Sequence, residues 1–178
     1  MELRIGQKVV YPGQGVCVVE ELRQKDIGGR TLQFYALRVA GDGSVIFIPT
    51  ANADGVGIRP VISRNRCKDL IDGLSTDFEP VSADWKTRSR QFTDQLQSGD
   101  VFEAADVLKK LAFLSHEKKL SFREQTLMEK AKNLIISEVT NAGKKDEGSL
   151  RGEIDELVES ACRKHLNTQP RVMAAAMH

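Results

Sequence analysis

Residues 9–20 have the sequence VVYPGQGVCVVE, in which two apolar runs are separated by the dipeptide Pro12-Gly13. Proline fixes φ at one corner of a turn and glycine accepts a positive φ at the next, so this pair favours chain reversal. The flanking valines pack well on a pleated surface. The stretch therefore predicts a hairpin with strands at 9–11 and 15–20.

The segment that follows repeats this pattern up to about residue 62. A glycine pair within 27–30 predicts a second hairpin turn, and residues 32–39 alternate between two faces as a third strand does. A tight turn at 41–43 leads to a fourth strand at 45–48, which Pro49 ends. Short strands separated by glycine turns predict a small, strongly bent antiparallel β-barrel.

From about Ser63 the sequence is typical of helices. Ser63 and Ser82 are N-cap candidates for helices ending near Gly73 and Gln97, with a connecting loop from about 72 to 80. Asp100 with Glu103 and Ser121 with Glu124 have the spacing of capping boxes.

Apolar residues follow both capping boxes with a period near 3.6, and residues 141–143 form a stop signal. A last helix is predicted at 149–166. The fold class is thus α+β multidomain. We expect a β domain at 1–62, an all-α domain at 63–166 and a mobile tail at 167–178.

Charge and composition exclude several classes of protein. The 178 residues include 26 Lys and Arg and 25 Asp and Glu, which gives a net charge of +1. The overall charge is therefore too small for nonspecific binding along nucleic acid, and any DNA contact must come from a local cluster of basic residues. No apolar run approaches the roughly 20 residues that cross a bilayer, and the first six residues hold no secretory signal core. Cys17, Cys67 and Cys162 are far apart and odd in number, which favours inert thiols in reducing cytoplasm over disulfides or a zinc site.

No constellation of residues supports an enzyme. The chain has no glycine-rich phosphate motif, and the histidines at 116, 165 and 178 are isolated. Glu20, Glu21 and Asp54 sit among ordinary surface positions, and Cys17 lies inside a predicted strand. We therefore expect no catalytic residue, no metal and no cofactor.

Residues 85–90, WKTRSR, combine the single tryptophan of the chain with three cations and no acid. One interpretation is a tryptophan packed in a helical core beside solvated charges. The other is an exposed aromatic wedge for the DNA minor groove, with Arg and Lys on the phosphates. Composition alone favours the first and cannot decide between them.

Several segments occur together in a characteristic order: GQKVVYPGQGV at 6–16, FYALRV at 34–39, Ile48-Pro49, VGIR at 56–59, Trp85 before basic residues, SGDVFE at 98–103, LSFRE at 120–124 and Ala131-Lys132. Their order and separations resemble the CarD/CdnL family of bacterial transcription regulators over about residues 3–142. The resemblance implies a Tudor-like barrel that docks on the β subunit of RNA polymerase. It also implies a helical domain whose tryptophan wedges into the minor groove at the upstream edge of the transcription bubble and stabilises the open promoter complex.

The resemblance also implies two sets of site residues. For DNA they are Trp85, Lys86, Arg88, Arg90 and Phe122; Thr87 stands where the family usually has an arginine, and Phe122 either supports Trp85 or is core. For polymerase they are Lys25, Ile27, Val45, Ile46, Phe47, Ile48 and Pro49. Phe47 replaces a basic residue that is often found there, so an exposed Phe47 would make that contact more apolar.

Two other functions stay open at this point. The helical domain could recruit a protein instead of DNA, which a buried Trp85 would favour. Alternatively the barrel could be a peptide-binding Tudor-like adaptor with an aromatic cage of Tyr11, Phe34 and Tyr35. The resemblance implies a cytoplasmic monomer, associated with the nucleoid through polymerase and not with membranes.

Overall fold

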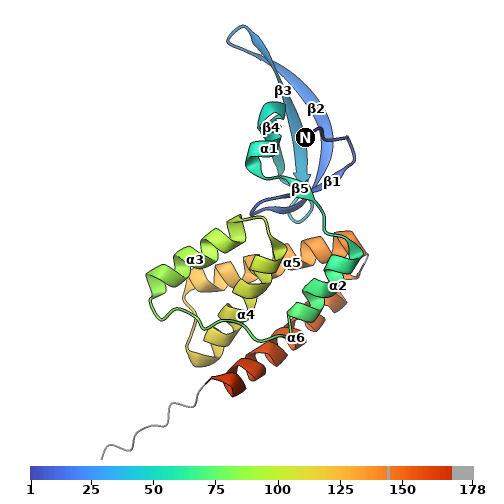
Figure 1. Ribbon diagram of the computed structural model, residues 1–178. Helices are drawn as coiled ribbons and strands as arrows, with labels where there is room; N and C mark the ends of the chain where they lie inside the picture. Colours follow the sequence, from blue (N-terminus) through green and yellow to red (C-terminus); the bar gives the residue numbers. More distant parts are fainter. Residues whose placement is uncertain (144, 170–178) are drawn as a thin grey trace, which may run out of the picture.

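The computed structural model describes residues 1–143 and 145–169, and Figure 1 shows a β domain above a group of helices. The β domain is a five-stranded antiparallel sheet with strand order β4-β3-β2-β1-β5. Its strands are β1 (Lys8–Tyr11), β2 (Gly15–Ile27), β3 (Arg30–Val39), β4 (Val45–Pro49) and β5 (Arg59–Pro60). β4 and β5 are therefore the two edges of the sheet.

The β2–β3 hairpin is longer than the sequence predicted. β2 was expected to end at residue 20 but continues to Ile27, because residues 21–27 pair with 30–36 of β3 beyond a register shift at Val19/Glu21. Gly28 and Gly29 form the tip with φ of 58° and 77°, which other residues rarely adopt. The tip projects away from the helices (Figure 1).

The core of the sheet is built from alternate residues of its strands. It contains Leu3, Val9, Cys17, Val19, Tyr35, Leu37, Val39, Ile48, Ala53 and Ile58. A 3₁₀ turn (Thr50–Asn52) and the short helix α1 (Ala53–Val56), neither of which was predicted, lead the chain from β4 to β5. α1 buries Ala53 in this core, and Ile58, which lies between α1 and β5, is also buried there.

Five longer helices form a second core. They are α2 (Arg64–Gly73), α3 (Trp85–Gln97), α4 (Val101–Glu117), α5 (Phe122–Gly143) and α6 (Glu147–Thr168). Leu96, Leu111, Ile135, Leu150 and Ile154 are among its fully buried side chains. The fold class, a Tudor-like β domain followed by a helical domain, is confirmed. Within the described residues no helix is long and apolar enough to cross a membrane.

Helix starts test the capping predictions. Ser63 caps α2 as predicted, since its side chain accepts from Arg66 N. Ser121 and Glu124 form a complete capping box, in which Glu124 N donates to Ser121 Oγ and Ser121 N donates to Glu124 Oε2. Asp100 caps α4, since its side chain accepts from Phe102 N. The Glu103 carboxylate accepts from Gln95 of α3 and not from Asp100 N, so this capping box is incomplete.

Two predicted starts are wrong. Asp84, not Ser82, caps α3, because its carboxylate reaches Thr87 N, whereas the Ser82 carbonyl accepts from Arg88. α6 begins at Glu147 and is capped by Asp146, whose side chain accepts from Ser149 N. Residues 167–168 belong to α6, and 170–178 of the predicted tail lie outside the described residues.

Candidate DNA and polymerase interfaces

Trp85 is the first residue of α3, and 63% of its surface is exposed. Asp84 fixes this helix start: its Oδ2 accepts from Thr87 N at 3.0 Å and from Thr87 Oγ1. The same side-chain and backbone hydrogen bonds from Thr87 lower the pKa of Asp84. Thr87, which departs from the family pattern, thus supports the cap that presents Trp85, and the interpretation of Trp85 as core is wrong.

Cations and a second aromatic lie near this helix start. Lys86 Nζ is 5.6 Å from the centroid of the Trp85 ring, and Arg90 is exposed one turn further along α3. Phe122, the first residue of α5, is 86% exposed, so it is not a core residue. Arg123 joins the two helices, because its Nε donates to Ser89 Oγ at 2.8 Å. Sequence reasoning did not single out Arg123, although it lies inside the LSFRE segment.

Arg88 corrects the predicted set of DNA contacts. Only 5% of its surface is exposed, and its Nη2 donates to Glu124 Oε1 at 2.8 Å. Its Nη1 donates to the carbonyl of Ser82 at 2.9 Å. A guanidinium committed to a buried carboxylate and a loop carbonyl does not reach a phosphate. Arg88 instead holds the residues that precede Trp85.

Glu124 gathers charge and hydrogen bonds from three elements. Burial would raise the pKa of its carboxyl, but bonds from Ser121 N, Arg88 and Lys118 outweigh burial and lower that pKa from 4.5 to about 2. Lys118 Nζ lies 3.2 Å from Glu124 Oε2. The carboxylate therefore joins the start of α5 to α3 and to the α4–α5 turn.

This geometry predicts an acid dependence of stability. Because the folded-state pKa is depressed, the stabilisation from Glu124 is fully present above about pH 4.5 and is lost as the pH falls towards about 2. Thermal melts of the parent protein and of Glu124→Gln between pH 7 and pH 3 test this. We expect the variant to be less stable at pH 7 and the difference to shrink at low pH. A pH-independent difference would contradict the assignment.

The expected polymerase face lies along β4 and the β2–β3 hairpin. A groove there is lined by Arg23, Gln24, Lys25, Ile27, Phe34 and Phe47. Phe47 is exposed, and the Arg23 guanidinium carbon lies 5.3 Å from the centroid of its ring. β4 is an edge strand, whose free backbone groups can pair with a strand of another protein.

Side-chain burial divides the residues predicted for this face. Lys25, Ile27, Val45 and Phe47 are exposed, whereas Ile46 and Pro49 are half-buried. Ile48 is a correction: its side chain is part of the sheet core, because alternation along β4 points it away from Phe47. Ile48, which pairs with Tyr35 of β3, therefore offers no side chain to a partner at this edge.

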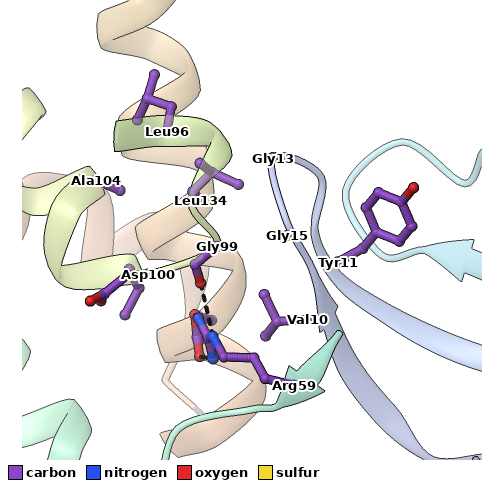
Figure 2. Close-up of a pocket in the computed structure, with 12 residues that line it drawn as sticks. Val10, Tyr11, Gly13, Gly15, Arg59, Leu96, Gly99, Asp100, Ala104 and Leu134 are labelled. Carbon is purple, nitrogen blue, oxygen red and sulfur yellow. Dashed lines mark hydrogen bonds and ion pairs between the residues drawn. The ribbon is translucent and has the colours of Figure 1, made fainter. Parts of the chain in front are cut away.

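A contact between the β domain and the helices completes the arrangement (Figure 2). Arg59 of β5 donates from Nη1 and Nη2 to Glu138 of α5 at 2.5 and 2.8 Å, and from Nε to the Gly99 carbonyl at 2.8 Å. Glu138 is buried and also accepts from Ile62 N. A Cβ at Gly99 would lie 3.1 Å from Cγ of Pro12, so this position, at φ +83°, requires glycine. Sequence reasoning missed this contact.

The remaining candidates do not form sites. Tyr35 is buried with its hydroxyl accepting from Leu3 N, and Phe34 points to the opposite face, so the two do not form a cage. His116 pairs with exposed Glu159, and His165 is buried in the helical domain; His178 lies outside the described residues. Among residues 1–143 and 145–169, no group of three or more His, Cys, Asp or Glu could hold a metal ion.

Comparison with known proteins finds two family domains in this chain. Residues 3–62 match the CarD-like/TRCF RID domain, and residues 69–155 match the CarD C-terminal domain. "Putative transcription factor YdeB" of Bacillus subtilis is 27% identical over 136 residues, which is 76% of this chain and 89% of that protein. A solution NMR structure of the 72-residue N-terminal domain of Myxococcus xanthus CarD is 37% identical, with a TM-score of 0.29, over 33% of this chain and 79% of that one. Because both matched domains occur in order along one chain, the protein belongs to the CarD/CdnL family of bacterial transcription regulators, which interact with RNA polymerase.

Proposed function

We propose that this protein docks on the β subunit of RNA polymerase and stabilises the open promoter complex by wedging Trp85 into the minor groove at the upstream edge of the bubble. The observation that carries the proposal is the exposure of Trp85 at a capped helix start. A large apolar side chain left in solvent marks a binding surface when neighbouring side chains hold it in place.

The groups around Trp85 suit a nucleic acid better than a protein. Lys86, Arg90, Lys118 and Lys119 are exposed near the starts of α3 and α5, and Phe122 adds a second aromatic surface. Proteins that bind the minor groove frequently insert an apolar side chain between two base pairs, with Arg and Lys beside it. Our proposed DNA surface therefore consists of Trp85, Lys86, Arg90 and Phe122, without Arg88.

The barrel supplies the second half of the mechanism. The chain carries a net charge of only +1, so free protein should hold DNA weakly and with little sequence preference. Docking through the β4 edge and the hairpin groove would raise the local concentration of the DNA surface at the promoter. A ligand that binds open DNA better than closed DNA shifts the equilibrium by that difference alone.

Footprinting of the promoter complex tests the function as a whole. Permanganate reactivity of thymines across the bubble is followed after a competitor traps released polymerase, with and without the full-length protein. We expect upstream-edge thymines to stay reactive several times longer when the protein is present. Equal decay of reactivity in both reactions would refute stabilisation of the open complex.

A further inference from the structure

The loop between α2 and α3 leads directly into Trp85, yet it contains no regular secondary structure. It runs from residue 74 to the capping Asp84, and its last residues are held by Arg88. A segment of this length would move freely unless other parts of the protein bind it. The residues that hold its first half therefore bear on where Trp85 lies.

The C-terminal turns of α6 hold the first half of this loop. His165 Nδ1 lies 2.7 Å from Asp77 Oδ1, and Thr168 Oγ1 donates to Asp77 Oδ2 at 2.6 Å. The His165 ring stacks on Phe78 with centroids 4.1 Å apart and an interplanar angle of 14°. We refer to Asp77, Phe78, His165 and Thr168 as the loop latch.

His165 is the central member of the loop latch. Its surface is 2% exposed, and the ring of Phe113 from α4 packs against it nearly perpendicularly, with ring centroids 4.8 Å apart. The Nε2 atom lies 3.0 Å from the side-chain amide nitrogen of Gln169, which donates to it. Nδ1 therefore carries the hydrogen and donates to the Asp77 carboxylate. Both ring nitrogens are thus satisfied in one orientation, which fixes the ring and its partners.

Two lysines add backbone contacts at the beginning of the same loop. Lys164 of α6 donates to the Ser75 carbonyl at 2.7 Å. Buried Lys109 of α4 donates to the Gly73 carbonyl at 2.9 Å, at the end of α2. These bonds satisfy carbonyls that a helix end and an irregular loop would otherwise leave without partners.

The end of α6 also reaches the surroundings of Trp85. A depression beside the tryptophan is lined by Pro80, Val81, Ser82, Ala83, Trp85, Arg88, Phe113, Leu114, Glu117, Lys118 and Gln169. Gln169 directly follows α6, and Phe113 contacts both this depression and His165. The loop latch and the wedge are therefore connected through shared side chains.

We propose that His165 is a positioning residue, which through the loop latch fixes the α2–α3 loop and so presents Trp85 in the geometry that DNA requires. A binding group works only when the residues behind it hold it to within a fraction of an ångström. The latch residues of α6 lie beyond residue 155, where the matched C-terminal domain ends. This inference rests on the proposed function of Trp85 as the DNA wedge.

Two substitutions in α6 separate positioning from stability. His165→Ala removes the Asp77 bond and the stack on Phe78, whereas Ile154→Ala opens a cavity in the core of the same helix and leaves the latch bonds in place. Both variants should melt at a lower temperature. Below both melting temperatures, only His165→Ala should shorten the open-complex lifetime, by at least threefold. His165→Asn, which restores an amide donor near Nδ1, should recover part of that loss.

Trp85 itself supplies a readout without DNA, because it is the single tryptophan of the chain. Time-resolved fluorescence anisotropy should show a larger fast component in His165→Ala than in the parent protein or in Ile154→Ala. If the anisotropy of folded His165→Ala is unchanged, or if Ile154→Ala shows the same increase, positioning by His165 is overturned. If the anisotropy changes as expected but Trp85→Ala leaves the open complex unaffected, the wedge fails and the loop latch stands.

Discussion

Trp85→Ala should shorten the lifetime of the open complex about fivefold to a hundredfold, because loss of one base–aromatic contact costs roughly 1–3 kcal/mol. The effect should appear in the open complex and not in the closed one, since the wedge acts only on a base step that is already disturbed. Polymerase binding should be unchanged, because the β4 edge and the hairpin groove lie in the β domain, away from Trp85.

Thermal stability decides whether such a result reflects the wedge. The exposed Trp85 side chain contributes little to the helical core, so the free energy of unfolding should change by less than about 0.5 kcal/mol. Ile5→Ala, which removes another exposed apolar side chain, is the control and should change neither quantity. A strongly destabilised Trp85→Ala, or a stable one whose open complexes persist as before, would remove the wedge assignment.

Ile27→Glu should weaken binding to RNA polymerase by about thirtyfold or more. Ile27 lies in the hairpin groove beside Phe34 and Phe47, where a partner would leave the new carboxylate desolvated, at a cost of at least about 2 kcal/mol. Binding of the purified core enzyme and of a β-subunit fragment can be measured by biolayer interferometry. Retained binding of both by a variant with a normal circular dichroism spectrum would exclude this face.

Leu22→Glu is a matched control for that experiment. Leu22 and Ile27 are 46% and 47% exposed on the same strand, but the register places their side chains on opposite faces of the hairpin. The two variants therefore have the same charge and nearly the same effect on the free chain. Normal polymerase binding by Leu22→Glu beside weak binding by Ile27→Glu would assign the docking face.

Strand and helix patterns could be predicted from the sequence because they depend on near neighbours. The Pro12-Gly13 turn, the Ser63 cap and the Ser121–Glu124 capping box need only residues within a few positions of one another. Ser82 and Asp84 are both good N-cap residues at similar positions, and sequence alone does not rank them. In the structure the Asp84 carboxylate accepts from Thr87 N, while the Ser82 carbonyl accepts from the distant guanidinium of Arg88.

The site residues show where such prediction stops. Trp85 and Arg88 are three positions apart on one helix, yet one is exposed and the other buried. The difference arises from Glu124, 36 residues further along the chain, which supplies a buried carboxylate. A pattern of cations around a tryptophan cannot reveal which of them has a distant partner. For the same reason the contacts of Arg59 with Glu138 and of Asp77 with His165 left no local signal.

The Arg59–Glu138 pair bears on which base-pair step of the promoter Trp85 contacts. Glu138 is buried and would lose its charged partner if Arg59 moved away, so we expect this joint between β5 and α5 to resist bending. If both surfaces bind as proposed, the protein holds Trp85 at a fixed distance from the RNA polymerase β subunit. The distance between the polymerase-binding face and Trp85, and not the base sequence, then determines which base-pair step the Trp85 indole contacts. Substitution of Arg59 or Glu138 would therefore shift the base-pair step that Trp85 contacts along the DNA, without changing the residues that contact polymerase or DNA.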